Sequence, residues 1–572
     1  MRCRGECFCA VSVYFELRIG TVMYAIGIDF GTLSVRGILV DIHTGKEMAV
    51  SEFPYPHGVM ERNLPTGECL EAGWALQHPM DYIEGLIYVV NEVRAKTGVP
   101  ADEIVGIGVD FTSSTVIPVD KEGIPLCCKE EFVHEPHAYA KLWKHHGAEQ
   151  EAEFINQVAL ERNEKWLDYC GGKVSGESML PKIFETLRHA PKVYENAERM
   201  IEALDWIIWM LTGTETRALC AAGYKAFYHL PEGYPSKEFL RALDERLENL
   251  VEDKLKAPMK SIGETAGYLT EDMAKKLALF PGTPVGSGII DAHASVLGSG
   301  ISRPEELMII MGTSACHLLH SEVRAAIPGI SGVVLGGMLP QYYGYEAGQS
   351  CVGDLFAWFV KNSVPEAYKR EAEEKGFSIY ELLESKLEGY RTGSSGLLAL
   401  DWFNGVRSPL EDFELNGLLL GMNLLTKPEE IYMALIEATA YGTRLIIDNF
   451  EQAGVVIKSI VAGGGIAAKS KLVLQVYADV CNREIRVSDS AQVCALGAAM
   501  LGVAAAPAEI TGYHGITDVV ERLGKRKEQA YIPKQENVVV YDQLYQEYKM
   551  LAEYFGKGGN DVMKRLNRMR FG

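Results

Sequence analysis

The chain has 572 residues and a mass of 63.1 kDa; 47% of the residues are hydrophobic and 23% are charged. This composition is typical of a globular protein in water, and the length predicts at least two domains. No run of about 18 apolar residues occurs, so we expect no membrane-spanning helix. The formal net charge of -21 repels phosphate backbones and anionic lipids, which disfavours nucleic acid and membranes as partners.

The twelve cysteines are scattered without paired C-x-x-C spacing, and Cys127-Cys128 are adjacent. This pattern predicts reduced thiols in the cytoplasm rather than a disulfide framework. Residues 1–22 carry a short apolar patch but no small-residue cleavage site, so we expect no signal peptide. We expect this segment to be an extension outside the fold, because a strand pattern begins directly after Met23.

The first half of the chain alternates apolar strands with helical segments, which predicts an α/β domain over residues 23–280. Strands at 24–28 and 35–41 flank Gly31-Thr32 and predict a β-hairpin. A buried strand is expected over 104–120. Helices are expected over 79–98, 180–188 and 201–211.

Proline and glycine gather between residues 255 and 284, which predicts a domain boundary near residue 281 and a second α/β domain over 281–572. In this half a strand–Gly312-Thr313–strand pattern repeats the first hairpin. An amphipathic helix is expected over 428–450, and a strand, three glycines and a helix over 457–480. The charged helical segment from residue 541 is expected to be a peripheral decoration.

The two Gly-Thr bends are candidate phosphate-binding elements. Glycine lets backbone N–H groups approach an anion closely, and the threonine hydroxyl adds a donor. One such bend would be interpreted as a tight turn with polar residues, but two with matched strands favour phosphate binding. Asp29, beside the first bend, is a candidate to hold Mg²⁺ through water.

The segment Ala462 to Ser470, "AGGGIAAKS", follows a predicted strand and opens a helix. It is either a flexible loop or a place where the backbone approaches a base or ribose, with a helix N-terminus facing anions. It is not a Walker loop, because Ala468 rather than glycine precedes Lys469-Ser470.

Asp291 lies within the apolar run "PVGSGIIDAHASVLGSG". An unpaired buried carboxylate costs several kcal/mol, so this acid is expected to face a cleft and accept a proton from a substrate hydroxyl. The alternative is a helix N-cap after a glycine-rich turn, and an N-cap facing a cleft could serve both purposes.

Taken in order, "GIDFGTLSVRG", "MLPKI", "GSGIIDAHA", "MIIMGTSAC", "NGLLLGMNL" and "VAGGGIAAKS" resemble the FGGY family of carbohydrate kinases. The resemblance covers Met23 to about Pro507. It implies an α/β fold of two ribonuclease-H-like domains of the actin and hexokinase type with an interdomain cleft. It also implies ATP as the phosphoryl donor and Mg²⁺ as its cofactor.

The resemblance also implies roles for individual residues. It places Asp29 at the metal-nucleotide position and Asp291 at the position of the catalytic base. The expected ATP-binding residues are Gly31, Thr32, Gly312, Thr313, Ser314, Gly463, Gly464 and Gly465. The expected substrate-binding residues are Phe111, Thr112, Ser113, Lys225, Asp291 and Glu346.

Two of these substrate-binding residues also stand out by composition. Recognition of a polyhydroxyl compound requires charged or amide groups that can bond neighbouring hydroxyls. Lys225 and Glu346 are charged residues in otherwise apolar, glycine-flanked stretches. A surface lysine with a buried stem is the alternative for Lys225. Ser113 departs from the alanine often found at its position.

Longer stretches, among them "DWIIWMLTGTETRALCAAGYKAFYH" and "EAGQSCVGDLFAW", resemble the family branch that acts on L-ribulose in L-arabinose catabolism. The expected activity is cytoplasmic, ATP-dependent phosphorylation of a ketopentose, L-ribulose to L-ribulose 5-phosphate. The alternatives are the same chemistry on xylulose, ribitol or glycerol, and, from another class, an actin-like protein whose binding is gated by ATP. The expected partners are the sugar, ATP and a second copy of the chain in a homodimer.

Overall fold

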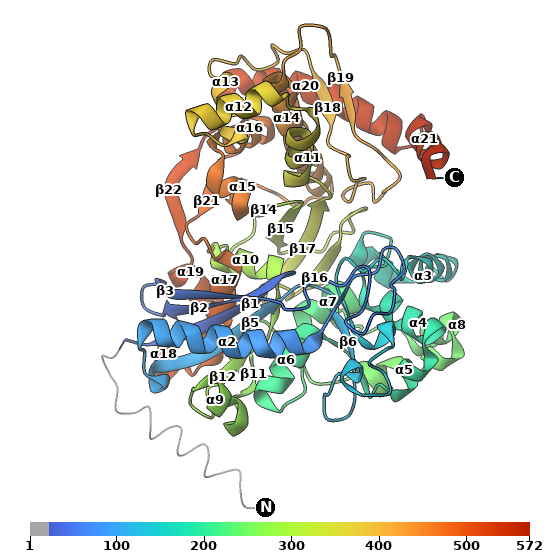
Figure 1. Ribbon diagram of the computed structural model, residues 1–572, viewed down its shortest axis with the longest axis vertical. Helices are drawn as coiled ribbons and strands as arrows, with labels where there is room; N and C mark the ends of the chain where they lie inside the picture. The colour runs from blue at the N-terminus through green and yellow to red at the C-terminus, as the bar shows by residue number, and fades with distance from the viewer. Residues whose placement is uncertain (1–21, 572) are drawn as a thin grey trace, which may run out of the picture. The chain divides into compact units, whose positions relative to one another are not determined.

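The computed structural model describes residues 22–571, so the extension expected at residues 1–22 lies almost wholly outside the described residues (Figure 1). The chain forms two compact units. The first comprises the chain up to Ser302 together with Val333–Gly344 and Gln492–Lys525. The second comprises Arg303–Gly332, Tyr345–Ala491 and Arg526–Gly572.

These units correct the expected boundary near residue 281. Residues 281–302 belong to the first unit, because β12 and β13 pair with β5 in its sheet and α10 packs on α17. The C-terminal part of the chain also returns to the first unit at residues 492–525. Composition gave no indication of this return.

The first unit is built on a mixed sheet in the order β11-β12-β5-β1-β2-β3, with β13 also paired to β5. Its strands are β1 Tyr24–Phe30, β2 Ser34–Asp41, β3 Glu47–Pro54, β5 Ile104–Phe111, β11 Thr265–Tyr268, β12 Pro284–Gly286 and β13 Ile289–Ile290. The expected hairpin is β1-β2, closed by a hydrogen bond from Gly31 N–H to Ser34 O of 3.0 Å. The strand expected over 104–120 divides into β5 and β6, separated by a loop at 112–115.

A smaller sheet in the order β4-β7-β6-β8 lies in the same unit. Its strands are β4 Leu76–Gln77, β6 Val116–Val119, β7 Ala140–Lys141 and β8 Arg199–Glu202, and β9 Arg217–Ala218 pairs separately with β10 Met259–Lys260. The helix expected to start at residue 201 begins at Ala203, because residues 199–202 pair with β6 as a strand.

Helices surround both sheets of the first unit. They are α2 Pro79–Thr97, α3 Glu149–Glu161, α4 Met179–His189, α5 Pro191–Asn196, α6 Ala203–Thr212, α7 Leu219–Ala226, α8 Lys237–Leu243, α9 Glu271–Leu277, α10 Asp291–Gly298, α17 Val493–Ala505, α18 Ala508–Thr511 and α19 Ile516–Leu523.

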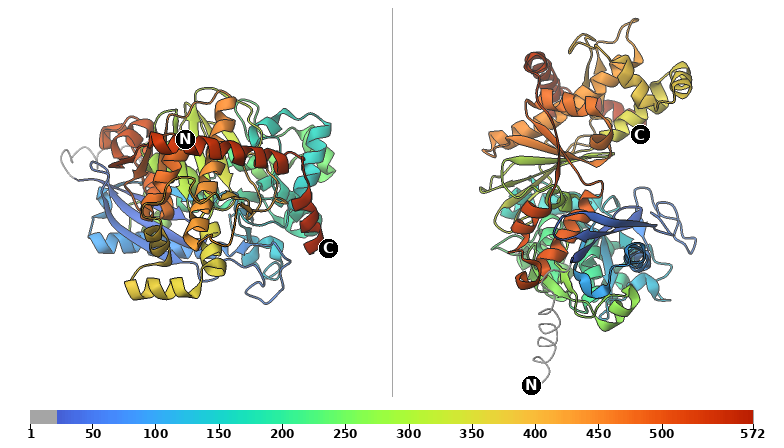
Figure 2. Two further views of the ribbon diagram at one scale, coloured as in Figure 1. Left: turned by 90° about the horizontal axis from the view of Figure 1, so that it is seen from above. Right: turned by 90° about the vertical axis from the view of Figure 1, so that its left-hand side faces the viewer.

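Helix α17 packs directly on β1 and β5, and its red ribbon beside the blue strands shows how far apart these elements are in sequence (Figure 2). Glycines make this approach possible. A Cβ at Gly108 would lie 1.8 Å from the Ala498 carbonyl oxygen, and one at Gly27 would lie 2.0 Å from that of Ala495. Helix and sheet therefore meet backbone to backbone.

The second unit contains the strands β15, β14, β20, β21 and β22, neighbours in that order. Their bounds are β14 Glu306–Met311, β15 Ala315–Ser321, β20 Ser459–Gly463, β21 Ile485–Ser488 and β22 Arg526–Tyr531; β16 Gly332–Leu335 and β17 Tyr343–Gln349 span the unit limits, and β18 Leu398–Leu400 pairs with β19 Leu418–Leu420. The helices are α11 Gly353–Ser363, α12 Glu366–Lys375, α13 Ile379–Lys386, α14 Pro428–Gln452, α15 Gly464–Lys469, α16 Lys471–Cys481, α20 Gln535–Gly556 and α21 Val562–Phe571.

Helix α20 corrects the expectation of a peripheral C-terminal decoration. It packs on α14 and α16, and its residues Tyr541, Tyr545 and Tyr548 are each at most 1% exposed. The Tyr548 hydroxyl donates to the buried Asp401 carboxylate at 2.7 Å. The many charged residues of α20 suggested an exposed helix, but its tyrosines form a buried face. This helix therefore belongs to the core of the second unit.

The expected α/β class is confirmed by both units. Within the described residues, no single helix is long and apolar enough to cross a bilayer. Helix α17 reaches that length only together with residues 508–523, to which it is bent by 112°.

Gly108→Ala tests the backbone contact between α17 and the sheet. The added methyl group has no room beside the Ala498 carbonyl, so we expect the free energy of unfolding to fall by at least about 2 kcal/mol. Urea unfolding measures it. Gly465→Ala is the matched control, because nothing lies within 4 Å of its Cβ position. Equal losses in both variants would contradict the packing argument.

Candidate active site

Three carboxylates of the first unit come together at the end of its central strands. Asp29 on β1 lies opposite Asp110 on the parallel strand β5. Strand β13 pairs with β5 at Asp110 and Phe111, and Asp291 follows it as the first residue of α10. Asp110 is fully buried, Asp29 is 7% exposed and Asp291 is half-buried.

Burial shifts the titration of the two strand carboxylates. It raises the pKa of Asp29, and it raises the pKa of Asp110 well above the ordinary value, with the charges of Asp29 and Asp291 adding to the effect on Asp110. The guanidinium of Arg36, 3.6 Å from the Asp29 carboxylate, opposes the shift of Asp29.

Neither oxygen of Asp110 accepts a hydrogen bond from an N–H or O–H group of the described residues, whereas the Asp29 carboxyl is within hydrogen-bonding reach. A proton on Asp110, donated to Asp29, satisfies both groups. Carboxyl oxygens are the ligands that suit a hard divalent cation and its waters, and a bound cation would displace the shared proton, so the residues fit the expected Mg²⁺.

Asp110 was missed by the sequence analysis, although a sequence feature points to it. Gly27-Ile28-Asp29-Phe30 and Gly108-Val109-Asp110-Phe111 are near repeats, and the two segments pair in register. Comparing the two strands would have suggested a second acid beside Asp29.

The N-cap alternative for Asp291 is wrong in its detail. The cap residue of α10 is Ile290, and Asp291 is the first helical residue. Its Oδ1 accepts the N–H of the next residue, Ala292, at 2.6 Å. The acid therefore lies in the first helical turn, directly after the strand that borders Asp110.

The first predicted phosphate bend is held by two neighbours that the sequence did not reveal. The carbonyl of Thr32 accepts from Gln77 Nε2 at 2.8 Å, and its hydroxyl accepts from the indole N–H of Trp143 at 3.1 Å. Gly31 and Thr32 are both half-buried. The threonine hydroxyl thus has a fixed orientation within the first unit.

The predicted sugar loop at 111–113 divides into a buried and an accessible part. The Phe111 ring is 1% exposed and stacks on Phe30, with 4.8 Å between the ring centroids. Its side chain therefore packs in the core and does not contact the sugar as expected. Thr112 is buried, and its hydroxyl lies 3.0 Å from that of Thr115. Ser113 is half-buried.

Lys225 is half-buried on α7, and its charge acts on the buried carboxyl of Glu202. Burial raises the pKa of Glu202 to about 8, with Asp205 adding to the shift and Lys182 and Lys225 opposing it. Glu202 lies opposite Val116 in the small sheet, next to the sugar loop. Glu202 was not predicted as a site residue, because residues 201–211 read as a single helix whereas residues 199–202 form a strand.

In the second unit, the other bend and the glycine segment are neighbours. β14 and β20 are parallel, with Ile310 opposite Gly463. A Cβ at Gly464, whose φ is +90°, would lie 2.6 Å from the Met311 carbonyl oxygen. The three glycines, Gly463, Gly464 and Gly465, therefore run directly beside the strand that leads into the bend.

The bend itself, Gly312, Thr313 and Ser314, is tied to the start of α11. The carbonyls of Gly312 and Thr313 accept the N–H groups of Gly353 and Val352, each at 2.9 Å. Glu346, the remaining predicted sugar residue, is 8% exposed on β17 of the same unit.

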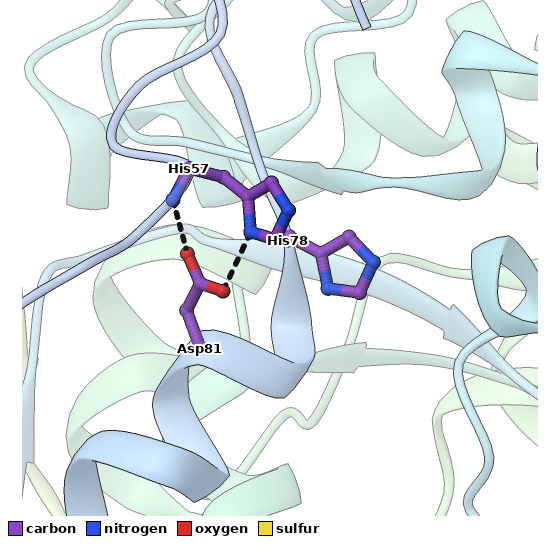
Figure 3. A group of neighbouring side chains, drawn as sticks. All are labelled: His57, His78 and Asp81. Carbon is purple, nitrogen blue, oxygen red and sulfur yellow. Dashed lines mark hydrogen bonds and ion pairs between the residues drawn. The ribbon is translucent and has the colours of Figure 1, made fainter. Parts of the chain in front are cut away.

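A separate group of potential metal ligands, His57, His78 and Asp81, lies at the start of α2 (Figure 3). Both oxygens of Asp81 already accept hydrogen bonds from His57, from Nδ1 at 2.7 Å and from the backbone N–H at 3.0 Å. The two imidazole rings stack at 4.7 Å with only 21° between their planes, so their in-plane lone pairs do not converge on one ion. This group ties a loop to the helix.

Comparison with known proteins defines the class. The N-terminal domain of the FGGY family of carbohydrate kinases matches residues 24–298, and the C-terminal domain of that family matches residues 307–506. The chain belongs to the FGGY family of carbohydrate kinases. The expected family and enzyme class are therefore confirmed.

Among its relatives, the ribulokinase of Geobacillus thermodenitrificans is 50% identical over 548 residues, which cover 96% of this chain and 97% of that protein. The ribulokinase of Bacillus licheniformis is 51% identical over 539 residues, 94% of this chain and 98% of that protein. A xylulose kinase structure from Lactobacillus acidophilus superimposes with a TM-score of 0.77 at 18% identity, covering 94% of this chain and 99% of that one. The last match shows the fold alone.

Glu202→Gln tests the buried carboxyl. Burial raises the pKa of Glu202 from 4.5 to about 8, so the stabilisation it gives in acid is lost as the pH rises toward 8. Glutamine does not ionise. The free energy of unfolding of the variant should therefore rise relative to wild type by up to about 1.4 kcal/mol per pH unit over this range.

Urea unfolding of both proteins at several pH values measures the difference. Glu84→Gln, at an exposed position of α2, is the matched control and should run parallel to wild type at every pH. A pH-independent difference for Glu202→Gln would show that the carboxyl is ionised in the folded protein.

Proposed function

We propose that this protein is an ATP-dependent ribulokinase that transfers the γ-phosphoryl group of ATP to the terminal hydroxyl of L-ribulose, giving L-ribulose 5-phosphate and ADP. The observation that carries the proposal is the 50% identity to ribulokinases over nearly the whole of both chains. The carboxylates of the first unit and the glycine-rich bends of both units supply the chemistry that this reaction needs.

Asp291 is the proposed base. A free aspartate has a pKa of about 3.9 and is ionised at neutral pH, and phosphoryl transfer needs only a positioned acceptor for the hydroxyl proton. The sugar oxygen forms a bond to the γ-phosphorus, the bond to the β-phosphate oxygen breaks, and the proton passes to the Asp291 carboxylate. The half-buried position of this side chain leaves it accessible to a substrate.

Mg²⁺ would be held through water by Asp29, with Asp110 beside it, and would neutralise charge on the ATP phosphates. The nucleotide phosphates are assigned to Gly31 and Thr32 of the first unit and to Gly312, Thr313 and Ser314 of the second. Adenosine is assigned to Gly463, Gly464 and Gly465. Glycines at these positions let backbone N–H groups face the anion.

The sugar hydroxyls are assigned to Ser113, Lys225, Asp291 and Glu346, with Thr112 contributing through its backbone. Charged groups that are partly withdrawn from water form strong hydrogen bonds to hydroxyls. Lys225 and Glu346 are both at least partly buried. The cytoplasmic location and the homodimer stay predictions.

A panel of sugars tests the substrate. Purified protein with ATP and Mg²⁺ is assayed for ADP release with L-ribulose, D-ribulose, D-xylulose, ribitol and glycerol. We expect the largest kcat/KM with L-ribulose and little ADP release without sugar. A larger kcat/KM with xylulose, ribitol or glycerol would contradict L-ribulose as the substrate while leaving the chain a carbohydrate kinase. Rapid sugar-independent ATP turnover would favour the actin-like alternative.

Asp291→Asn tests the base. The amide keeps the shape of the carboxylate but takes no proton, so kcat should fall by at least about 100-fold while ATP binding is retained. Steady-state kinetics and calorimetric titration with ADP measure the two effects. Asp518→Asn, the same change in the first turn of α19, is the matched control and should leave kcat unchanged. Turnover retained in Asp291→Asn would remove Asp291 from the mechanism.

A further inference from the structure

Lys182, the lysine of the motif "MLPKI", has no role in the scheme above. It lies on α4 and is fully buried. Within the described residues, no carboxylate oxygen lies within 4.0 Å of its Nζ. Instead Nζ donates to two backbone carbonyls, Ser114 O at 2.7 Å and Leu142 O at 2.8 Å. Buried lysines are rare and are normally paired with an acid, so this environment is unusual.

The first carbonyl lies one residue beyond the predicted sugar loop at 111–113. Ser114 directly follows Ser113 and has a φ of +54°, which is a left-handed conformation that serine rarely adopts. The hydrogen bond from Lys182 Nζ to Ser114 O helps to hold this conformation directly after Ser113.

The second carbonyl leads to the phosphate bend. Leu142 immediately precedes Trp143, whose indole N–H donates to the hydroxyl of Thr32 at 3.1 Å. One ammonium group therefore connects the loop that carries Ser113 with the segment that orients Thr32. Both bonds and all of these residues lie within the first unit.

Stability alone does not account for a lysine at this position. Burial lowers the pKa of Lys182 to about 7, which means that the charged form is disfavoured by its surroundings. An apolar side chain of the same length would avoid this cost but would leave the Ser114 and Leu142 carbonyls without their donor. The gain from the ammonium is geometric, because it supplies N–H donors at a point where two loop carbonyls converge.

We propose that Lys182 is a positioning residue of the sugar site, which holds the backbone at Ser113-Ser114 and the Leu142-Trp143 segment in register without touching a substrate. The proposal rests on the kinase function proposed above. It assigns to the lysine of "MLPKI" the alignment of the sugar loop with the Thr32 bend. A displacement of about 1 Å in a reacting group can cost roughly 100-fold in rate.

Lys182→Met tests this. Methionine keeps the length of the stem and removes the donors, so kcat/KM for the sugar should fall by about 100-fold. ADP binding without sugar, measured by calorimetry, should stay close to wild type, since most proposed nucleotide residues lie in the second unit. Unchanged kcat/KM in a folded Lys182→Met protein would overturn the proposal.

Asn156→Leu is the matched control for the loss of a buried donor to a loop carbonyl. Asn156 is 8% exposed on α3, and its Nδ2 donates to Val174 O at 2.8 Å, outside residues 111–115 and 142–143. We expect it to lower the unfolding temperature about as much as Lys182→Met does, with little change in sugar kcat/KM. Equal kinetic losses in the two variants would assign the effect to destabilisation and contradict positioning.

Two further measurements keep the test decisive. Lys182→Arg retains N–H donors and should recover part of the lost kcat/KM. If Lys182→Met does not fold, Lys182→Arg is compared with Lys182→Ala instead. A folded Lys182→Arg protein whose sugar kcat/KM does not exceed that of Lys182→Ala would overturn the proposal. The kinetics are run on the best sugar of the panel. Failure of L-ribulose as a substrate would therefore refute the proposed function while leaving the role of Lys182 measurable.

Discussion

The close approach of glycine backbones holds together the part of the first unit that carries its three central carboxylates. Helices α10 and α17 meet at Gly298 and Gly497, where a Cβ would lie 2.0 Å and 1.9 Å from the facing carbonyl oxygens. Glycines of β1 and β5 make the same approach to α17. The three elements that carry Asp29, Asp110 and Asp291 are thus fixed against one helix, and side chains of any size would drive them apart.

This tight packing buries Asp29 and Asp110 and thereby disfavours the ionised form of each carboxyl. Burial of Asp29 and Asp110 on adjacent strands raises the pKa of both carboxyls, and the charge of Asp29 adds to the shift of Asp110. Farther along the same unit, Glu202 and Lys182 are shifted in opposite directions by the same cause, burial. Ionisable groups with strongly shifted pKa values concentrate at functional sites, because a bound ion of opposite charge can stabilise their ionised form.

Much of the fold and part of the site could be predicted from the sequence. The two Gly-Thr hairpins, the α14 helix and the glycine segment follow from short-range patterns of apolar residues and glycine. Asp291 was identified because a lone acid in an apolar run demands an explanation. These features depend on local sequence, and the structure places them in the expected elements.

What was missed depends on contacts between distant parts of the chain. No local pattern tells that α17 covers β1, that Trp143 binds Thr32, or that Lys182 reaches Ser114. The buried face of α20 was hidden because its tyrosines carry polar hydroxyls among many charged residues. Phe111 was placed in the sugar site by resemblance, whereas packing decides its side-chain position.

The path of the polypeptide has a consequence for synthesis on the ribosome. The first unit lacks the helix that covers its central strands until residues 493–505 have been translated, about 200 residues after its last sheet strand, β13. Its amino-terminal three hundred residues emerge with an apolar sheet face uncovered. We therefore expect the first unit to complete its core only after α17 has emerged, and the uncovered strands to be prone to aggregation until then.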